Sequence, residues 1–192
     1  MSTVFIFHGT GGHPGENWFP WLKEKLEAAG HSAIVPKFPT PEGQSLQSWL
    51  AVFDKYKDKV DEQTIFVAHS LGCIFLLRVL EKLPHLVRAA IFVSAPVGVE
   101  PIKNYAGDKA FSDGFDFDWQ NIKAKALQFL VFHSDDDPYI SLGNGEKLAK
   151  ELAIPLTFIP HAGHFNAKAG FTIFPQLLQK LGPYLDKFDT GV

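Results

Sequence analysis

The chain has 192 residues, of which 46% are hydrophobic and 20% charged, and its formal net charge is -3. This length and composition fit a single globular domain, residues 1–192, with a sizeable core. The near-neutral charge and the absence of a Lys/Arg block argue against nucleic-acid binding. No apolar run reaches the roughly 20 residues that span a membrane. The single cysteine, Cys73, excludes an internal disulfide and a zinc finger.

Short apolar runs, rich in β-branched and aromatic residues, alternate with longer helical patterns. The first run, 1–7, lacks a basic segment and a cleavage site, so it predicts a strand and not a signal peptide. The runs are near-continuously apolar, as strands buried on both faces of a parallel sheet are. The predicted strands are Thr3–Phe7, Ala33–Pro36, Thr64–Ala68, Ala90–Ser94, Leu127–Phe132 and Leu156–Ile159. The predicted helices are Trp18–Ala29, Leu46–Lys59, Leu71–Leu83, Trp119–Lys125, Gly145–Leu152 and Phe171–Lys187.

Several predicted helix ends carry their own signals. Ala29-Gly30 is typical of a helix C-terminus, and Ser45 is a plausible N-cap. Pro84 disfavours helical backbone at Leu83, so the helix is expected to stop there. Alternation of strands and helices with short connections predicts an α/β fold, a doubly wound parallel sheet of six strands with helices on both faces.

The segment 97–118 interrupts this alternation. It is longer than most connections without structure of their own, and it mixes Gly and Asp with aromatic residues, namely Tyr105, Phe111, Phe115 and Phe117. One interpretation is a surface loop whose aromatic side chains pack on the domain. The other is a short lid whose aromatic side chains wall a substrate pocket, since the segment follows the carboxyl end of a strand. The sequence leaves both open.

Ser70 stands where a predicted buried strand meets a predicted apolar helix, within Ala68-His69-Ser70-Leu71-Gly72. A G-x-S-x-G motif in this context forms a nucleophile elbow, a sharp turn that exposes the serine hydroxyl at the top of the sheet. Ala68 replaces the first glycine and adds one methyl group; Gly72 keeps the second. A serine at this point is otherwise often a simple N-cap. The strand-turn-helix context favours a nucleophile.

A serine nucleophile needs a base and an acid, which follow it in the chain order Ser, acid, His in α/β-hydrolases. Ser134 to Pro138, with three consecutive aspartates, follows one predicted strand, and Gly163-His164-Phe165 follows the next. His161 lies close enough to compete as the base. The residues alone leave the acid open among Asp135, Asp136 and Asp137.

The glycine-rich run His8-Gly9-Thr10-Gly11-Gly12 follows the first predicted strand. Such a loop lets backbone N–H groups face a pocket. The Thr10 N–H is therefore predicted to be the second oxyanion donor, beside the N–H of Leu71 at the start of the helix after Ser70. A phosphate cradle is the alternative for such glycines. The chain contains neither G-x-G-x-x-G nor Gly-Lys-Ser/Thr at this point, so a nucleotide site is not expected.

These motifs together, over essentially the whole chain, resemble the small serine hydrolases that include retinoblastoma-binding protein nine, a compact branch of the α/β-hydrolase superfamily. The resemblance implies a minimal lid and hydrolysis of small esters or amides without a cofactor or metal. By position it implies Ser70 as the nucleophile, Asp136 as the acid and His164 as the base. The residues predicted to bind substrate adjoin these motifs or lie in the 97–118 segment: His8, Gly9, His69, Phe111, Phe115 and Phe165.

The family name raises a binding role, through a Leu-x-Cys-x-Glu motif. The chain has Leu71-Gly72-Cys73-Ile74-Phe75, with Phe in place of Glu and the run expected to be buried, so a retinoblastoma-type partner is not supported. Cys73 is predicted to be a small core residue.

The sequence therefore predicts a cytoplasmic serine hydrolase whose partner is a small ester or amide. Two alternatives keep the same fold. One is a binding module with a vestigial triad, and the other is a cofactor-free haloperoxidase or lyase.

Overall fold

Six parallel strands form one sheet in the order β2-β1-β3-β4-β5-β6 in the computed structural model, which describes residues 1–103 and 110–185. The strands are β1 Thr3–Phe7, β2 Ser32–Ile34, β3 Ile65–His69, β4 Val87–Val93, β5 Ala126–His133 and β6 Thr157–Phe158. All six predicted strands are present, which confirms the prediction of an α/β fold with a six-stranded parallel sheet.

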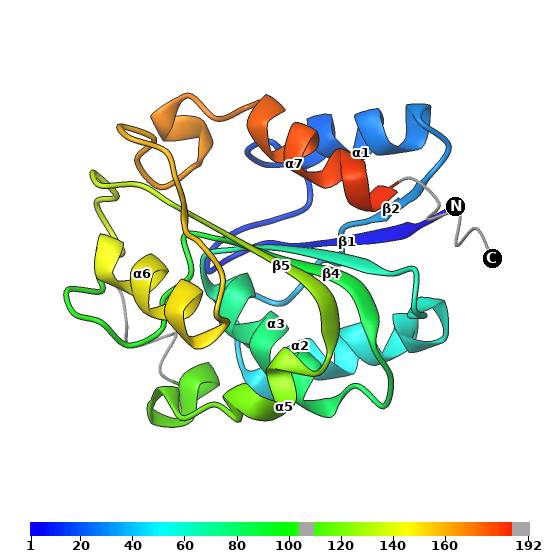
Figure 1. The fold of residues 1–192 in the computed structure, drawn as a ribbon, viewed down its shortest axis with the longest axis horizontal. Helices are drawn as coiled ribbons and strands as arrows, with labels where there is room; N and C mark the ends of the chain where they lie inside the picture. The colour runs from blue at the N-terminus through cyan, green and yellow to red at the C-terminus, as the bar shows by residue number, and fades with distance from the viewer. Residues whose placement is uncertain (104–109, 186–192) are drawn as a thin grey trace.

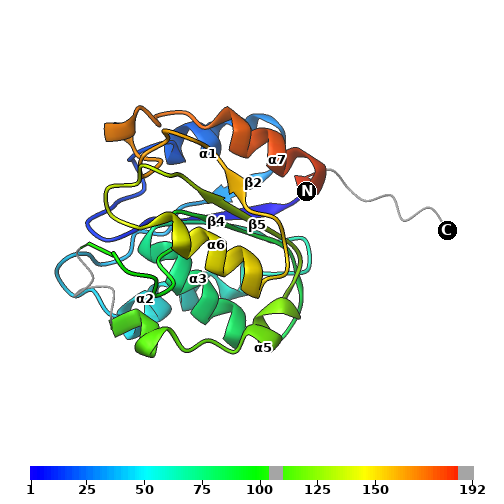
Figure 2. The same ribbon diagram turned by 60° about the vertical axis from the view of Figure 1, so that its left-hand side comes forward.

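Helices cover both faces of this sheet (Figures 1 and 2). Helices α1 and α7 lie on one face, while α2, α3, α5 and α6 lie on the other. The α-helices are α1 Phe19–Ala28, α2 Leu46–Phe53, α3 Leu71–Lys82, α5 Trp119–Lys123, α6 Leu142–Glu151 and α7 Pro175–Leu185. Short 3-10 helices are η1 Asp54–Lys59, η2 Asp113–Phe115 and η3 Ala167–Ala169.

Strand β1 shows why the strands read as continuous apolar runs. Its side chains alternate between two cores: Val4 and Ile6 pack with α1 and α7, whereas Phe5 and Phe7 pack with α2 and α3. Because successive side chains of a strand point to opposite faces, a strand covered on both sides must be apolar at every position. All four of these side chains are fully buried.

The helix ends follow the predicted signals, with local differences. The side chain of Ser45 accepts a hydrogen bond from the Ser48 N–H at 3.0 Å and caps α2, as predicted. Helix α3 ends at Lys82, before Leu83-Pro84. Helix α6 begins at Leu142, three residues earlier than predicted, and α7 begins at Pro175 and not at Phe171, since proline suits the first turn of a helix.

The aromatic side chains of the 97–118 segment pack on the domain wherever the structure describes them. Phe111 is fully buried against Trp49, and the guanidinium of Arg78 lies 4.3 Å above the ring of Phe117. Phe115 is partly buried against the same core. The described part of the segment thus corresponds to the packed-loop interpretation; Tyr105 lies outside the described residues.

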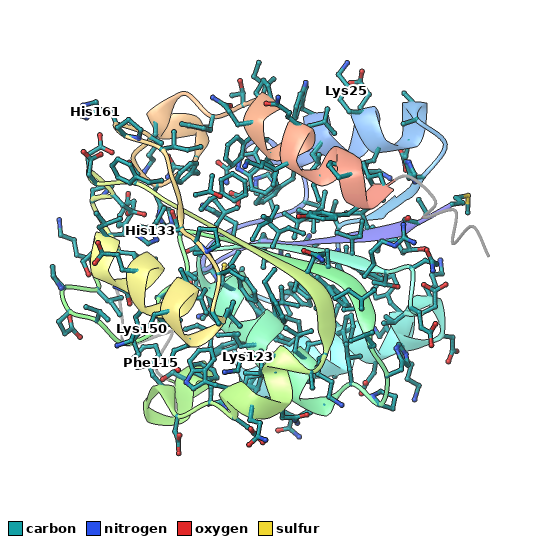
Figure 3. All side chains as sticks on the ribbon, viewed as in Figure 1. Lys25, Phe115, Lys123, His133, Lys150 and His161 are labelled. Atoms are coloured by element: carbon teal, nitrogen blue, oxygen red, sulfur yellow. The ribbon has the colours of Figure 1, made fainter. Side chains whose placement is uncertain are left out.

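Three histidines are buried at or directly after the carboxyl ends of strands: His8, His69 and His133. Burial lowers the pKa of each, since desolvation disfavours the charged imidazolium, and it lowers the pKa of His69 to about 3 with a further contribution from the nearby His164. The Nε2–H of His133 donates to the carbonyl of Ile140, and Figure 3 shows His133 in the interior of the molecule.

We expect acid to destabilise the fold through these three histidines. Their folded pKa values lie below the unfolded value of about 6.5, so the unfolded chain binds more protons in the window below that pH. The contribution of the three neutral histidines to the free energy of unfolding should be fully present above pH ~6.5. It should be lost as the pH drops toward about 3, the folded pKa of His69. Urea unfolding at a series of pH values measures this loss. His69→Gln should flatten the loss, whatever its effect at pH 7; an equal slope in both proteins would contradict the assignment.

Gly72, in the first turn of α3, lies where the helix crosses the end of β1. A Cβ added there would stand 2.6 Å from the carbonyl oxygen of His8 and 2.7 Å from that of Phe7. Backbone atoms of a central strand cannot move aside as a flexible side chain can. The second small residue of the elbow motif is therefore required by the approach of helix to strand.

Gly72→Ala should accordingly destabilise the protein by about 3 kcal/mol, at the upper end of overpacking costs, and lower Tm by roughly 6–12 °C. Gly15→Ala is the matched control, because its added Cβ would meet nothing closer than the His13 ring at 3.4 Å. Thermal unfolding of the two variants checks this. Equal Tm values would show that β1 and α3 can separate without cost.

Candidate active site

Ser70 occupies a strained turn between β3 and α3. Its backbone has φ 55° and ψ -127°, a conformation that a residue with a side chain rarely adopts. The turn is held on both sides: the Ser70 N–H donates to the Val93 carbonyl at 3.0 Å, and its own carbonyl accepts from the Cys73 N–H at 2.9 Å. This geometry matches the predicted nucleophile elbow.

The glycine-rich loop after β1 lies directly against Ser70. A Cβ on Gly9 would stand 2.8 Å from the Ser70 Cβ and 3.2 Å from its Oγ, so only a glycine lets the loop approach this closely. Thr10 lines the same pocket as Ser70. Leu71 is the first residue of α3, where a backbone N–H has no partner within the helix. The roles of Leu71 and Thr10 as oxyanion donors remain predictions.

His164 is held at three points. Its Nδ1 lies 2.8 Å from Oδ2 of Asp137, its backbone carbonyl accepts from Nε2 of His69 at 2.7 Å, and the ring of Tyr139 packs edge-on against its imidazole. A carboxylate only accepts hydrogen bonds, so Nδ1 carries the proton and the neutral ring leaves Nε2 able to take another. His161, by contrast, is exposed near the outer end of its loop (Figure 3).

The choice of Asp136 as the partner of His164 is wrong, because Asp137 makes that contact. Oδ1 of Asp136 accepts instead from the Ser134 hydroxyl and from the Gly163 N–H, both at 2.7 Å. The carboxyl group of Asp136 is exposed, whereas that of Asp137 is fully buried. The two neighbours thus point in different directions, one toward the backbone of the 161–163 turn and one toward the imidazole.

A signal in the sequence could have identified Asp137. Oδ1 of Asp137 accepts from the N–H groups of Tyr139 and Ile140, at 2.9 and 3.1 Å, so the side chain closes an Asx turn over Pro138. Asp-Pro is a common start of such a turn. The turn fixes one carboxylate oxygen and directs the other, Oδ2, at His164.

The Asp137 carboxyl group remains ionised despite its burial. Desolvation raises its pKa, but the hydrogen bonds from His164 and from the N–H groups of Tyr139 and Ile140 outweigh it, so that its pKa is lowered overall. A buried carboxylate bonded to an imidazole N–H holds that ring in one tautomer and stabilises its cation.

Ser70 and His164 line one pocket of about 720 Å³, together with Gly9, Thr10 and His69. A smaller pocket of about 280 Å³ adjoins it and shares Tyr139, His164, Asn166 and Lys168. The sequence prediction missed several residues of the larger pocket, which come from the loops after β1 and after His164: His13, Glu16, Asn17, Asn166, Lys168 and Thr172. Their nearness in sequence to Gly9 and His164 was the available signal.

Of the predicted substrate-binding residues, Gly9 and His69 line this pocket and the other four do not. His8 is buried, with Nδ1 bonded to the Gly9 carbonyl and Nε2 accepting from the Phe38 N–H. Phe165 is buried among Phe171 and Phe174, against α7. Phe111 and Phe115 lie in the core on the other face of the sheet, and Figure 3 shows Phe115 far from the loop of His161. The predictions for these four are wrong because the three phenylalanine rings complete the cores and the His8 ring is bonded to buried backbone groups.

Cys73 lies beneath the elbow as a core residue, as predicted. Its thiol is buried and donates to the carbonyls of Ala68 and Val93. Burial raises the pKa of this thiol far above its usual range. It is therefore not a second nucleophile.

Within residues 1–103 and 110–185, no group of three or more His, Cys, Asp or Glu side chains is arranged to hold a metal ion. No helix within the same ranges is long and apolar enough to cross a membrane.

Comparison with known proteins identifies relatives over nearly the whole chain. The protein YdeN of Bacillus subtilis, named as a hydrolase, is 34% identical over 186 residues, 96% of each chain. The crystal structure of that gene product superimposes with a TM-score of 0.90 over 97% of this chain and 100% of the other. The serine hydrolase RBBP9 of Rattus norvegicus is 30% identical over 160 residues, 83% of each.

More distant structures share the fold alone. The esterase domain of a Rhodothermus marinus protein has a TM-score of 0.65 at 13% identity, covering 95% of this chain and 86% of that domain.

The family model described as serine hydrolase matches residues 4–182. With the elbow at Ser70, the His164–Asp137 pair and these relatives, the chain belongs to the serine hydrolase family and has the α/β-hydrolase fold.

Proposed function

We propose that the protein hydrolyses small esters, and amides of similar size, through Ser70, His164 and Asp137. The observation that carries the proposal is the 2.8 Å contact between His164 Nδ1 and the buried Asp137 carboxylate, at the wall of the pocket that Ser70 lines. A neutral imidazole oriented in this way is the base that a serine hydroxyl requires. The esterase domain named above shares the fold and adds support by analogy.

In the proposed reaction, Nε2 of His164 takes the proton of Ser70 Oγ as that oxygen attacks the substrate carbonyl carbon. The backbone N–H groups of Leu71 and Thr10 bind the oxyanion, and Asp137 stabilises the imidazolium. His164 then returns the proton to the departing alcohol or amine, which leaves an acyl group on Ser70. Water, deprotonated by His164, attacks the acyl carbon; the bond from that carbon to Ser70 Oγ breaks, and His164 returns the proton to Oγ as the acid is released.

A fluorophosphonate probe tests the nucleophile. It should label the wild-type protein at one site, because such probes phosphonylate activated serines. Ser70→Ala should abolish labelling and lower kcat on p-nitrophenyl acetate by on the order of 10⁶-fold. Mass spectrometry of the labelled peptide identifies the site. Absent labelling of the folded wild type, or equal labelling of the variant, would contradict the proposal and favour a binding module.

The acid is tested by a matched pair of neighbours. Asp137→Asn should lower kcat by roughly 10⁴-fold, since an amide favours the wrong tautomer of His164. Asp136→Asn keeps an oxygen acceptor for the Ser134 hydroxyl and the Gly163 N–H, so its kcat should change far less. Steady-state kinetics on an activated ester, with thermal unfolding to confirm folding, measure both. The reverse order would restore Asp136 as the acid.

A further inference from the structure

Most of the side chains that line the larger pocket are of polar types. Among the described residues that line it, the apolar side chains are Ile140, Ala167 and the ring of Tyr139. The remainder are glycines, hydroxyls, amides, histidines and charged groups. An active site for alkyl chains is instead lined mainly by apolar side chains, because each methylene gains affinity only when it leaves water for apolar contact.

The phenylalanines and tryptophans that the structure describes lie outside this pocket wall. The sequence contains 18 Phe and 4 Trp, yet neither type is found in the described lining of this pocket. Phe165 and Trp18, which adjoin the lining residues His164 and Asn17 in the sequence, are fully buried, and the Trp18 indole N–H donates to the Phe165 carbonyl at 2.9 Å. The high aromatic content therefore reflects the two cores and not an acyl-binding pocket.

Several donors at the pocket have no partner within residues 1–103 and 110–185. The ammonium groups of Lys103 and Lys168 make no ion pair or hydrogen bond with any described residue, and neither does the hydroxyl of Thr172. Asn166 uses Oδ1 to cap η3, accepting from the Ala169 N–H, which leaves its amide N–H₂ available. Such donors match oxygen acceptors on a ligand.

The pocket is not a simple anion site, because Glu16 also lines it. This carboxyl is half-buried, and burial raises its pKa, with His13 and His164 opposing that effect. A carboxylate accepts hydrogen bonds from hydroxyl groups. Donors and an acceptor in one pocket suit a substrate that carries hydroxyl or ether oxygens.

The loop that carries three of the donors, Asn166, Lys168 and Thr172, is bonded to a second loop of the pocket. The Ala167 N–H donates to Oδ1 of Asn17 at 2.9 Å, which joins the 164–172 loop to the loop after β1 across the pocket rim. Groups held on a connected rim are positioned before a substrate arrives, which lowers the cost of binding it.

From the side chains that line this pocket we propose that the substrates are short, oxygen-rich esters. Their hydroxyl or ether oxygens are bound by Lys103, Lys168, Asn166 and Thr172. Esters of alkyl acids are then poor substrates. The inference rests on the proposed esterase function and specifies its substrate class.

Two p-nitrophenyl esters of nearly equal shape test the class. Butyrate and methoxyacetate differ by one methylene replaced by an ether oxygen, and their rates of hydroxide hydrolysis correct for intrinsic reactivity. After this correction, kcat/KM should favour methoxyacetate by about tenfold, the value of one good hydrogen bond to a charged donor. Octanoate should react more slowly than butyrate. A corrected preference for butyrate, or a rate that rises with chain length, would overturn the inference.

Variants then identify the donors. Lys168→Met and Thr172→Val remove the donor at nearly unchanged side-chain size. Each should raise KM for methoxyacetate more than KM for butyrate and so shrink the preference. Lys150→Met is the matched control, since Lys150 is an exposed lysine on α6 (Figure 3). An unchanged preference in both donor variants would contradict their role.

The outcomes separate the two proposals. Ser70-dependent hydrolysis with a preference for alkyl esters would contradict the proposed substrate class and still support the esterase function. Failure to hydrolyse any of the three esters, by protein that is shown to be folded, removes the proposed function itself.

Discussion

Hydrogen bonds from the end of β5 to the loop after β6 support the rest of the site. Asp135 accepts from the His161 N–H at 2.9 Å, Asp136 from the Gly163 N–H at 2.7 Å, and Asp137 from the His164 imidazole at 2.8 Å. The sheet alone holds this edge weakly, because β6 has only two residues. Three consecutive carboxylates therefore hold this edge as a longer strand pair would, and they set the position of His164 relative to the turn at Ser70.

The other half of the site depends on close backbone approach. Gly72 brings α3 against the end of β1, and Gly9 brings the following loop against Ser70. Both contacts exclude even a methyl group, so the position of Ser70 is set by close steric contact. His164, in contrast, is positioned by hydrogen bonding, including the bond to the Asp137 carboxylate. The candidate active site thus joins one region that is sensitive to side-chain size with another that is sensitive to ionisation.

The fold could be read from the sequence because its strands are buried on both faces. Val4 to Phe7 is apolar at every position for that physical reason, and Ser70 was visible from its place between β3 and α3. The sequence pattern does not show which of Asp136 and Asp137 contacts His164, since the two have the same chemistry and only the Asx turn distinguishes them. Phe111 and Phe165 were misassigned because aromatic content alone does not separate a pocket wall from a core.

The buried thiol beneath the elbow has a practical consequence. Cys73 is the only cysteine of the chain, and it is enclosed by the carbonyls that bind it. A cysteine introduced at the surface would consequently be the one accessible thiol, without prior removal of the native one. With one cysteine introduced in each of the two loops that flank the pocket, spectroscopic labels could be attached in an otherwise unaltered protein, and the distance between them followed as substrate binds.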